Sequence, residues 1–176
     1  GPHYNFANAL DYKDRLAEIR AKQKALIKSK TAVSGDTNWQ VNGSSSQGKK
    51  MVNDTQKLLL RAFNTECDEL IGKVKYTNYD ASLNRIYKSA ETISKLGVIM
   101  NISITPAYLN LKVEELRLSF EYQQKKQQEK ENLEIIQREI DAMLRRKERI
   151  SITALAKYAG VDRSYFYRNL QAKQMV

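Results

Sequence analysis

The fold of this chain depends first on one stretch, Trp39 to Asp68, which reads WQVNGSSSQGKKMVNDTQKLLLRAFNTECD. It contains the only Trp and the only Cys of the 176 residues, a serine loop bounded by glycines, and two adjacent lysines. From Gly48 onward, apolar residues recur at helical spacing, which predicts a helix that buries one side. The side predicted to be buried consists of Met51, Thr55, Leu58, Leu59, Ala62, Phe63, Leu70 and Ile71.

The start of this helix nearly matches a phosphate-binding loop. The run from Gly43 through Gly48 to Lys49 follows the pattern GxxxxGK, but Lys50 stands where Ser or Thr would hold magnesium. No hydrophobic strand precedes the loop, and no apolar strand ending in Asp follows it. Nucleotide hydrolysis is therefore disfavoured, whereas binding of an anion by the loop and the helix N-terminus stays open.

A polar stripe runs along the opposite side of the same helix. Side chains three or four residues apart share one helix face and can act together. We interpret them as a recognition surface, with an ordinary solvated face as the alternative; this surface comprises Lys49, Lys50, Asn53, Lys57, Arg61, Asn64 and Asp68. Trp39 and Cys67 are expected in the core beneath it, with Cys67 as a buried structural thiol rather than a nucleophile.

Composition favours a binding protein over an enzyme. The 30 basic and 20 acidic residues give a net charge of +10, and eight Lys or Arg against two acidic residues fall between Arg145 and the end. Such a chain attracts polyanions. The only histidine, His3, follows Gly1-Pro2, and residues 1–3 read as a cleavage scar. Without histidine, His-ligated zinc and Ser–His or Cys–His catalysis are excluded. Glu66, Asp68, Glu69, Glu114 and Glu115 look like solvated carboxylates, so we predict no catalytic residue, metal or cofactor.

The remaining pattern predicts a mainly α protein with a short strand or loop element. Residues 5–30 form a helix with a narrow apolar stripe, which suits a coiled coil or contact with a partner and docking on the chain's own domain equally. Residues 31–48 form a loop with a short strand at 39–41. Asp80 is the candidate N-cap of a helix that buries Leu83, Ile86, Tyr87, Ala90, Ile93 and Leu96 and ends at Gly97 as a C′ residue.

A longer helix is predicted from Thr105 as N-cap and Pro106 as first helical residue. It continues for about 40 residues through a stretch without apolar side chains at 123–131; a break near Asn132 is the alternative. The predicted organisation is a scar at 1–3, an N-terminal helix at 4–30, a compact recognition domain at 31–122, a polar helical rod at 123–132 and a basic unit at 133–176. One cysteine, no membrane-length apolar run and no signal peptide indicate a cytoplasmic protein.

The basic unit resembles helix-turn-helix heads of TetR-type regulators and of transposon helper proteins over residues 133–172. The pattern sxxxlAxxaGVsrsxlYr is carried by Ser151, Leu155, Ala156, Ala159, Gly160, Val161, Asp162, Arg163, Ser164, Phe166, Tyr167 and Arg168. The resemblance implies that Arg163, Ser164 and Tyr165 face the major groove of duplex DNA. It also implies that Tyr167 and Arg168 contact backbone phosphates or bases. Arg145, Arg146 and Lys147 would add phosphate contacts.

Residues 12–131 resemble the domain of unknown function found upstream of GIY-YIG-like nuclease domains, including SNIPE-type antiphage nucleases. The resemblance is carried by residues 12–16, 19–20, 23–24, 39, 41–44, 48–51, 53–54, 60–64, 66–68, 74–76, 104–106, 108–109, 111–112, 114–117 and 121–123. No GIY-YIG pattern follows, so nuclease activity is not expected here. The resemblance implies a targeting or sensing module in phage–host conflict.

The sequence as a whole therefore predicts a non-enzymatic module that binds duplex DNA through the helix-turn-helix unit. The alternative is a protein-sensing module that recognises a phage or host partner, directs an effector nuclease and binds no DNA itself. In either case we expect a homo-oligomer formed through helical contacts.

Overall fold

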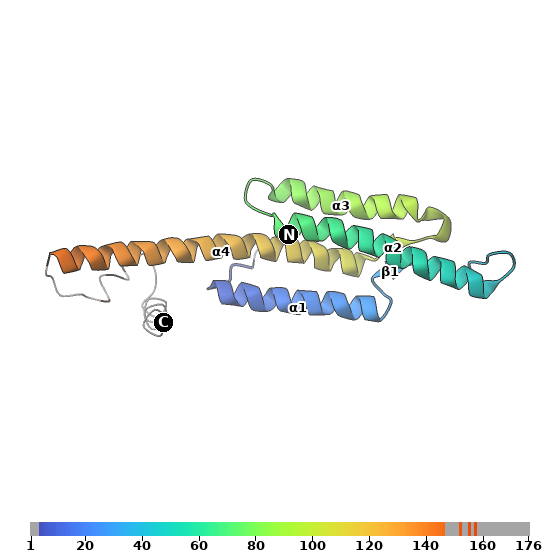
Figure 1. Ribbon diagram of the computed structural model, residues 1–176, viewed down its shortest axis with the longest axis horizontal. Helices are drawn as coiled ribbons and strands as arrows, with labels where there is room; N and C mark the ends of the chain where they lie inside the picture. Colours follow the sequence, from blue (N-terminus) through green and yellow to red (C-terminus); the bar gives the residue numbers. More distant parts are fainter. Residues whose placement is uncertain (1–3, 147–151, 153–154, 156, 158–176) are drawn as a thin grey trace. The chain divides into compact units, whose positions relative to one another are not determined.

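The computed structural model describes residues 4–146, 152, 155 and 157, and this part of the chain is mainly helical (Figure 1). The predicted fold class is confirmed. The chain divides into two compact units, Gly1–Gln123 and Gln124–Val176. The elements in chain order are α1 (Ala9–Lys28), β1 (Val33–Ser34), α2 (Ser45–Gly72), α3 (Tyr79–Leu96), the 3-10 helix η1 (Val98–Met100), β2 (Ser103–Ile104) and α4 (Pro106–Arg145).

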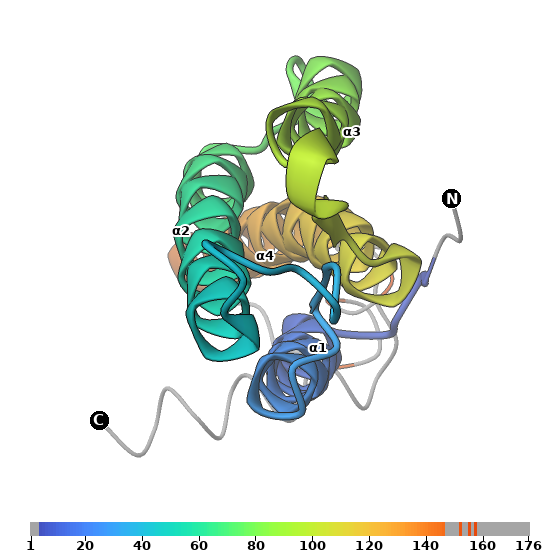
Figure 2. The same cartoon turned by 90° about the vertical axis from the view of Figure 1, so that its right-hand side faces the viewer.

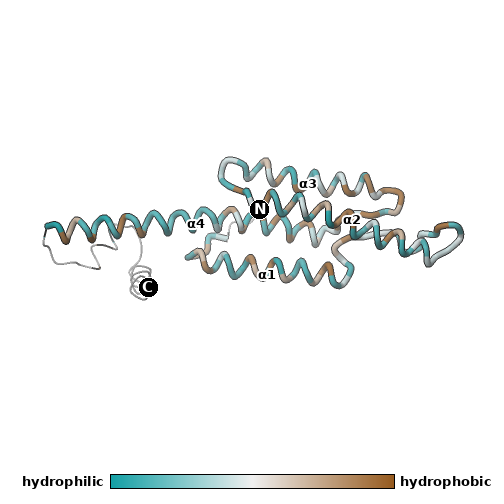
Figure 3. Tube along the Cα trace, viewed as in Figure 1, coloured by the Kyte–Doolittle hydropathy of each residue, from teal (hydrophilic) through white to brown (hydrophobic). Residues whose placement is uncertain are grey.

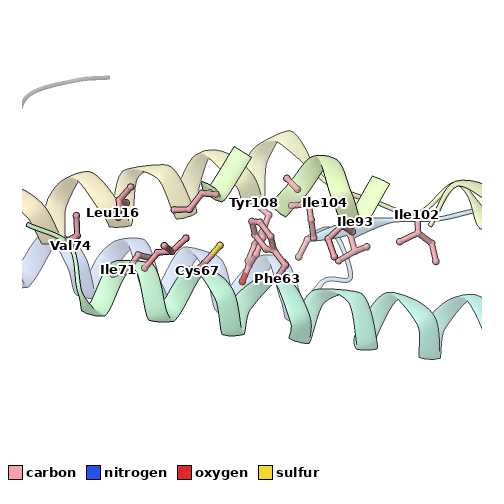
Figure 4. Packing of buried hydrophobic residues seen from close by; sticks show 14 of the residues in the cluster. Phe63, Cys67, Ile71, Val74, Ile93, Ile102, Ile104, Tyr108 and Leu116 are labelled. Atoms are coloured by element: carbon pink, nitrogen blue, oxygen red, sulfur yellow. The ribbon is translucent and has the colours of Figure 1, made fainter. Parts of the chain in front are cut away.

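The first unit is a helical bundle with a two-stranded antiparallel sheet. Seen end-on, α1 and α3 lie on opposite sides of α2 and the first part of α4 (Figure 2). Val33 pairs with Ile104 and Ser34 with Ser103, which ties the loop after α1 to the segment before α4. The main core lies between α2, α3 and α4, where Phe63 and Cys67 point toward Tyr108 (Figure 4).

Helix α1 docks on its own unit, which decides between the two alternatives that its sequence left open. Asn8 caps it by accepting a hydrogen bond from the backbone N–H of Asp11 at 3.0 Å. Tyr12, Leu16 and Ile19 are buried and form a cluster with Leu118 of α4. The narrow apolar stripe is therefore the contact with α4.

Three predictions about helix α2 and the segment before it are wrong. It begins at Ser45 rather than Gly48, because the hydroxyl of Ser44 accepts from the backbone N–H of Gln47 and caps it. Its buried side chains include Val52, Phe63, Cys67, Leu70 and Ile71, whereas Met51 and Leu58 are 45% and 68% exposed. The strand predicted at 39–41 is absent; Val41 forms only an isolated bridge with Ser44.

Helix α3 also differs at both ends. It begins at Tyr79 after Asn78, so Asp80 lies in the first turn and is not the cap. Gly97 has φ −92° and is not left-handed; a Cβ there would lie 2.7 Å from the carbonyl oxygen of Ile102. Close packing, rather than backbone conformation, therefore requires this glycine. Of the predicted apolar face, Ile86, Ala90 and Ile93 are buried, while Tyr87 and Leu96 are exposed.

Helix α4 runs for 40 residues, so the predicted length is confirmed and the break near Asn132 is not found. Thr105 Oγ1 accepts from the backbone N–H of Tyr108 at 3.4 Å, as the predicted N-cap requires. The hydropathy colouring shows the hydrophilic middle of the helix (Figure 3). No helix in the described ranges is both long enough and apolar enough to cross a membrane.

Candidate functional site

The apparent phosphate loop is the start of a helix. Ser44 is the N-cap, so Gly48 and Lys49 lie in the first turns of α2 rather than in an open loop. Gly48 is buried against the segment that precedes the helix: a Cβ on it would lie 1.7 Å from the carbonyl oxygen of Trp39. The glycine therefore serves the packing of residues 39–40 on α2. This explains the resemblance to GxxxxGK without a nucleotide phosphate.

The predicted recognition surface follows α2 but falls into three parts. At its start, Lys49 and Lys50 are exposed, and Lys50 Nζ lies 2.7 Å from Asp54 Oδ2. This contact raises the pKa of Lys50, mainly through the hydrogen bond to Asp54 and then through the charge of that carboxylate. In its middle, Asn53 and Lys57 line a pocket. Toward its end, two side chains contact α4, as described below.

The pocket lies where the end of α1 and strand β1 meet α2, and has a volume of about 150 Å³. We call it the basic pocket, because three lysines from different segments line it. The sequence spacing does not predict this pocket, because its lining residues come from separate segments that the turn after α1 brings together. Its lining comprises Ile27, Lys28, Lys30, Ala32, Val33, Asn53, Gln56, Lys57 and Leu60.

Lys30 occupies an unusual backbone position in this pocket. Its φ is 61°, in the left-handed region. The backbone N–H groups of Lys30 and Thr31 donate to the carbonyls of Ile27 and Leu26, at 3.1 and 2.9 Å. This is the Schellman pattern, in which the residue at C′ is usually glycine because a side chain is strained there. A lysine is held where glycine would fit better.

A second group of polar residues joins α1, α2 and α4 inside the first unit; we call it the buried ion network. Lys112 and Glu115 have side chains only 5% and 6% exposed, and their Nζ and Oε1 atoms are 3.4 Å apart. Gln23 Nε2 and Arg20 Nε donate to the two carboxylate oxygens of Glu115, at 2.9 and 3.0 Å. Lys112 also lies 3.2 Å from Asp68 Oδ1.

The pKa values in the network follow from this pairing. Burial acts to lower the pKa of Lys112, but the charge of Glu115, with Tyr108 and Asp68, raises it above its ordinary value. Burial acts to raise the pKa of Glu115, but Lys112 and the hydrogen bonds from Gln23 and Arg20 lower it. Both groups are therefore held charged, and the network fastens three helices together.

The far end of the recognition surface belongs to the same region. Asn64 accepts a 2.6 Å hydrogen bond from the hydroxyl of buried Tyr108, and Asp68 meets Lys112. Beside them, burial raises the pKa of the Cys67 thiol to about 12, so Cys67 is a buried structural thiol, as expected. Trp39 is half-buried and packs against the main core. Asn64 therefore supports the fold, whereas Asp68 makes a solvent-exposed contact with Lys112.

The remaining carboxylates that the sequence singled out do not converge. Glu66 pairs with Arg85 and Glu69 with Lys73, each on the surface of the first unit. Among the residues placed by the structure, no group of three or more His, Cys, Asp or Glu side chains is arranged to hold a metal ion.

The second unit has a small apolar core of its own. Ile136 and Met143 of α4 pack with buried Leu155, and Ile152 packs against the same cluster. Leu144, near the end of α4, is 60% exposed and lies outside this core.

Only part of the proposed DNA contact set can be placed. Arg145 and Arg146 are exposed at the end of α4, and Arg146 Nη2 lies 3.4 Å from Glu139 Oε1. The other predicted contact residues lie outside the described residues: Lys147, Arg163, Ser164, Tyr165, Tyr167 and Arg168.

Two family models match this chain. Residues 9–127 match the family described as the SNIPE associated domain, and residues 121–176 match a family of unknown function, DUF6262. The boundary between the two compact units, at Gln123–Gln124, falls within the overlap of the two matches. Neither a curated protein nor a solved structure matches the chain.

Proposed function

This chain belongs to the SNIPE associated domain family, and on that premise we propose that it is a non-enzymatic targeting module of a phage-defence system that binds duplex DNA through its C-terminal basic unit. The first unit would provide recognition and the second the contact with DNA. Nuclease chemistry would come from a separate effector.

The observation that carries this proposal is the concentration of basic residues on a unit with its own core. Eight Lys or Arg stand against two acidic residues from Arg145 onward. Ile136, Met143 and Leu155 give that unit an apolar centre separate from the main core. A small basic head of this kind suits a polyanion, because each phosphate neutralised by Lys or Arg releases condensed counterions.

Within the basic unit, the helix-turn-helix resemblance assigns roles to particular residues. Arg163, Ser164 and Tyr165 would read base edges, and Arg is suited to guanine because its planar fork meets O6 and N7 together. Tyr167 and Arg168 would contact backbone or bases. Arg145, Arg146 and Lys147 would position the unit through phosphate contacts without specifying sequence.

The test is fluorescence anisotropy with a labelled DNA duplex and the full chain. We expect Arg163→Ala with Arg168→Ala to weaken binding by about a hundredfold, at roughly tenfold per lost charged contact. The control, Lys24→Ala with Lys88→Ala, removes the same charge from exposed positions of the first unit and should change affinity little. Equal losses of affinity in both variants would show that binding depends on net charge alone and not on these two arginines.

A second function is favoured by one surface feature. Leu96, Val98 and Ile99, at the turn after α3, are 70%, 68% and 75% exposed. Clustered exposed apolar side chains are typical of protein contact sites. The chain would then sense a phage or host protein and direct an effector nuclease, with no DNA binding of its own.

Lysate from infected cells separates the two functions. If the chain is a protein sensor, Leu96→Ser with Ile99→Ser should abolish capture of a partner that the unaltered chain retains. If it is a DNA-binding module, the same variant should bind duplex DNA normally. We also propose that the chain self-associates through helical contacts, which light scattering of the purified chain would detect.

A further inference from the structure

We infer that the basic pocket is a binding site for a free nucleoside monophosphate, whose base enters the pocket and whose phosphate meets the lysines at its rim. This site is separate from the proposed DNA contact, because the pocket lies in the first unit and its lining comes from α1, β1, α2 and the turn after α1. The inference does not depend on DNA binding by the C-terminal unit.

The lysines give the first argument. Lys28, Lys30 and Lys57 line one small pocket, and none of them forms an ion pair with a carboxylate of the described residues. Three cationic side chains in the lining of one pocket favour an anionic ligand.

The floor and size of the pocket give the second argument. Buried Ala32 and Val33 and half-buried Leu60 supply an apolar floor, and Ile27, which is 41% exposed, adds apolar surface nearer the solvent. At about 150 Å³, the pocket is smaller than the 300–1,000 Å³ typical of sites that enclose a whole drug-sized ligand. It therefore suits a single ring system, with the charged part of the ligand left outside at the rim.

Two amide side chains in the lining narrow the ligand class. Gln56 Nε2 donates to the carbonyl of Val33 at 3.4 Å, which orients its amide within the lining. Asn53 is half-buried and lies one turn before it on α2. Asn and Gln amides pair a donor and an acceptor with the edge of adenine. An apolar floor, amide groups and a basic rim together match a nucleotide, and adenosine monophosphate in particular.

The backbone of Lys30 gives an independent argument. Its left-handed φ of 61° at a position that favours glycine places a charged side chain in the pocket lining at a conformational cost. Strain of this kind persists where it serves a function. Binding of the phosphate is a function that glycine could not perform.

The test is anisotropy of a fluorescent adenosine monophosphate analogue with the full chain, followed by competition with unlabelled ligands. We expect Lys57→Met and Lys30→Gly each to weaken binding about tenfold, as loss of one charged hydrogen bond implies. Lys88→Met, which removes the same charge from an exposed position on α3 outside the pocket, should bind normally. Adenosine, which lacks the phosphate, should compete at least tenfold more weakly.

Three results would overturn the inference: no nucleotide binding at about 1 mM, equal losses of affinity in Lys88→Met and the pocket variants, or binding only of an oligonucleotide and not of the free nucleotide. The variant Arg163→Ala with Arg168→Ala should keep full nucleotide affinity. Failure of this inference is therefore distinguishable from failure of DNA binding.

Discussion

Replacing Lys112 by methionine should lower the free energy of unfolding of the first unit by about 3 kcal/mol. Removing one partner of a buried ion pair typically costs 3–5 kcal/mol, because the other charge is left without compensation. The lower end applies because Glu115 keeps the hydrogen bonds from Arg20 and Gln23. The exposed contact with Asp68 adds little, since that carboxylate is 66% exposed and solvated.

Trp39 makes the measurement specific to the first unit. It is the only tryptophan of the chain and packs against the main core, so its fluorescence reports unfolding there. With a urea m-value of about 2 kcal/mol/M, a loss of 3 kcal/mol should move the midpoint down by roughly 1.5 M. The slope should stay unchanged, because the surface exposed on unfolding is the same.

A double variant separates the buried charge from lost packing. Replacing Lys112 by methionine and Glu115 by leucine removes both charges and keeps apolar volume, which is often neutral or stabilising. We expect the double variant to unfold within about 1 kcal/mol of the unaltered chain. A single variant that loses less than 1 kcal/mol, or a double variant that loses more than the single one, would refute this account of the network.

The pH dependence of stability follows from the same network. The stability contributed by Glu115 should be lost as the pH falls below the ordinary glutamate pKa of 4.5 and through the lowered pKa of the folded state. The stability contributed by Lys112 should be lost as the pH rises above the ordinary lysine pKa of 10.5 and through the raised pKa of the folded state. The unaltered chain should thus lose its advantage over single variants of the network at both extremes in urea titrations. Lys30→Gly should stabilise the first unit by about 1 kcal/mol, since glycine adopts the left-handed backbone conformation of this position without strain. A lower urea midpoint than that of the unaltered chain would show that Lys30 is not strained. Cys67 should resist thiol reagents at neutral pH and react once urea unfolds the chain, because burial raises its pKa to about 12; rapid labelling of the native chain would show that the thiol is accessible.

Local signals in the sequence predicted helix α4 well. Thr105 and Pro106 mark its start by chemistry that needs no partner, and good helix formers carry it through the polar stretch at 123–131. The buried side of α2 was predicted less well. Its apolar residues lie on more than one side, and only contacts with other elements decide that Phe63 is buried and Leu58 exposed.

The sites depended even more on tertiary structure. Lys112 and Glu115 are visible in the sequence as neighbours at helical spacing, but their burial results from helices α1 and α2, which the spacing does not reveal. The basic pocket forms because the turn after α1 returns the chain onto α2. Gly48 matched a phosphate-loop pattern, yet it serves close packing against Trp39, because the same small residue satisfies both requirements.

The salt dependence of duplex DNA binding tests the proposed function most directly. The logarithm of the affinity should fall linearly with the logarithm of salt concentration, and Arg163→Ala with Arg168→Ala should reduce the slope by up to about 2, one for each contact made to a phosphate. The charge-matched control, Lys24→Ala with Lys88→Ala, should keep the slope of the unaltered chain. Absence of binding at low salt, or an unchanged slope in the arginine variant, would contradict a DNA contact through the C-terminal unit.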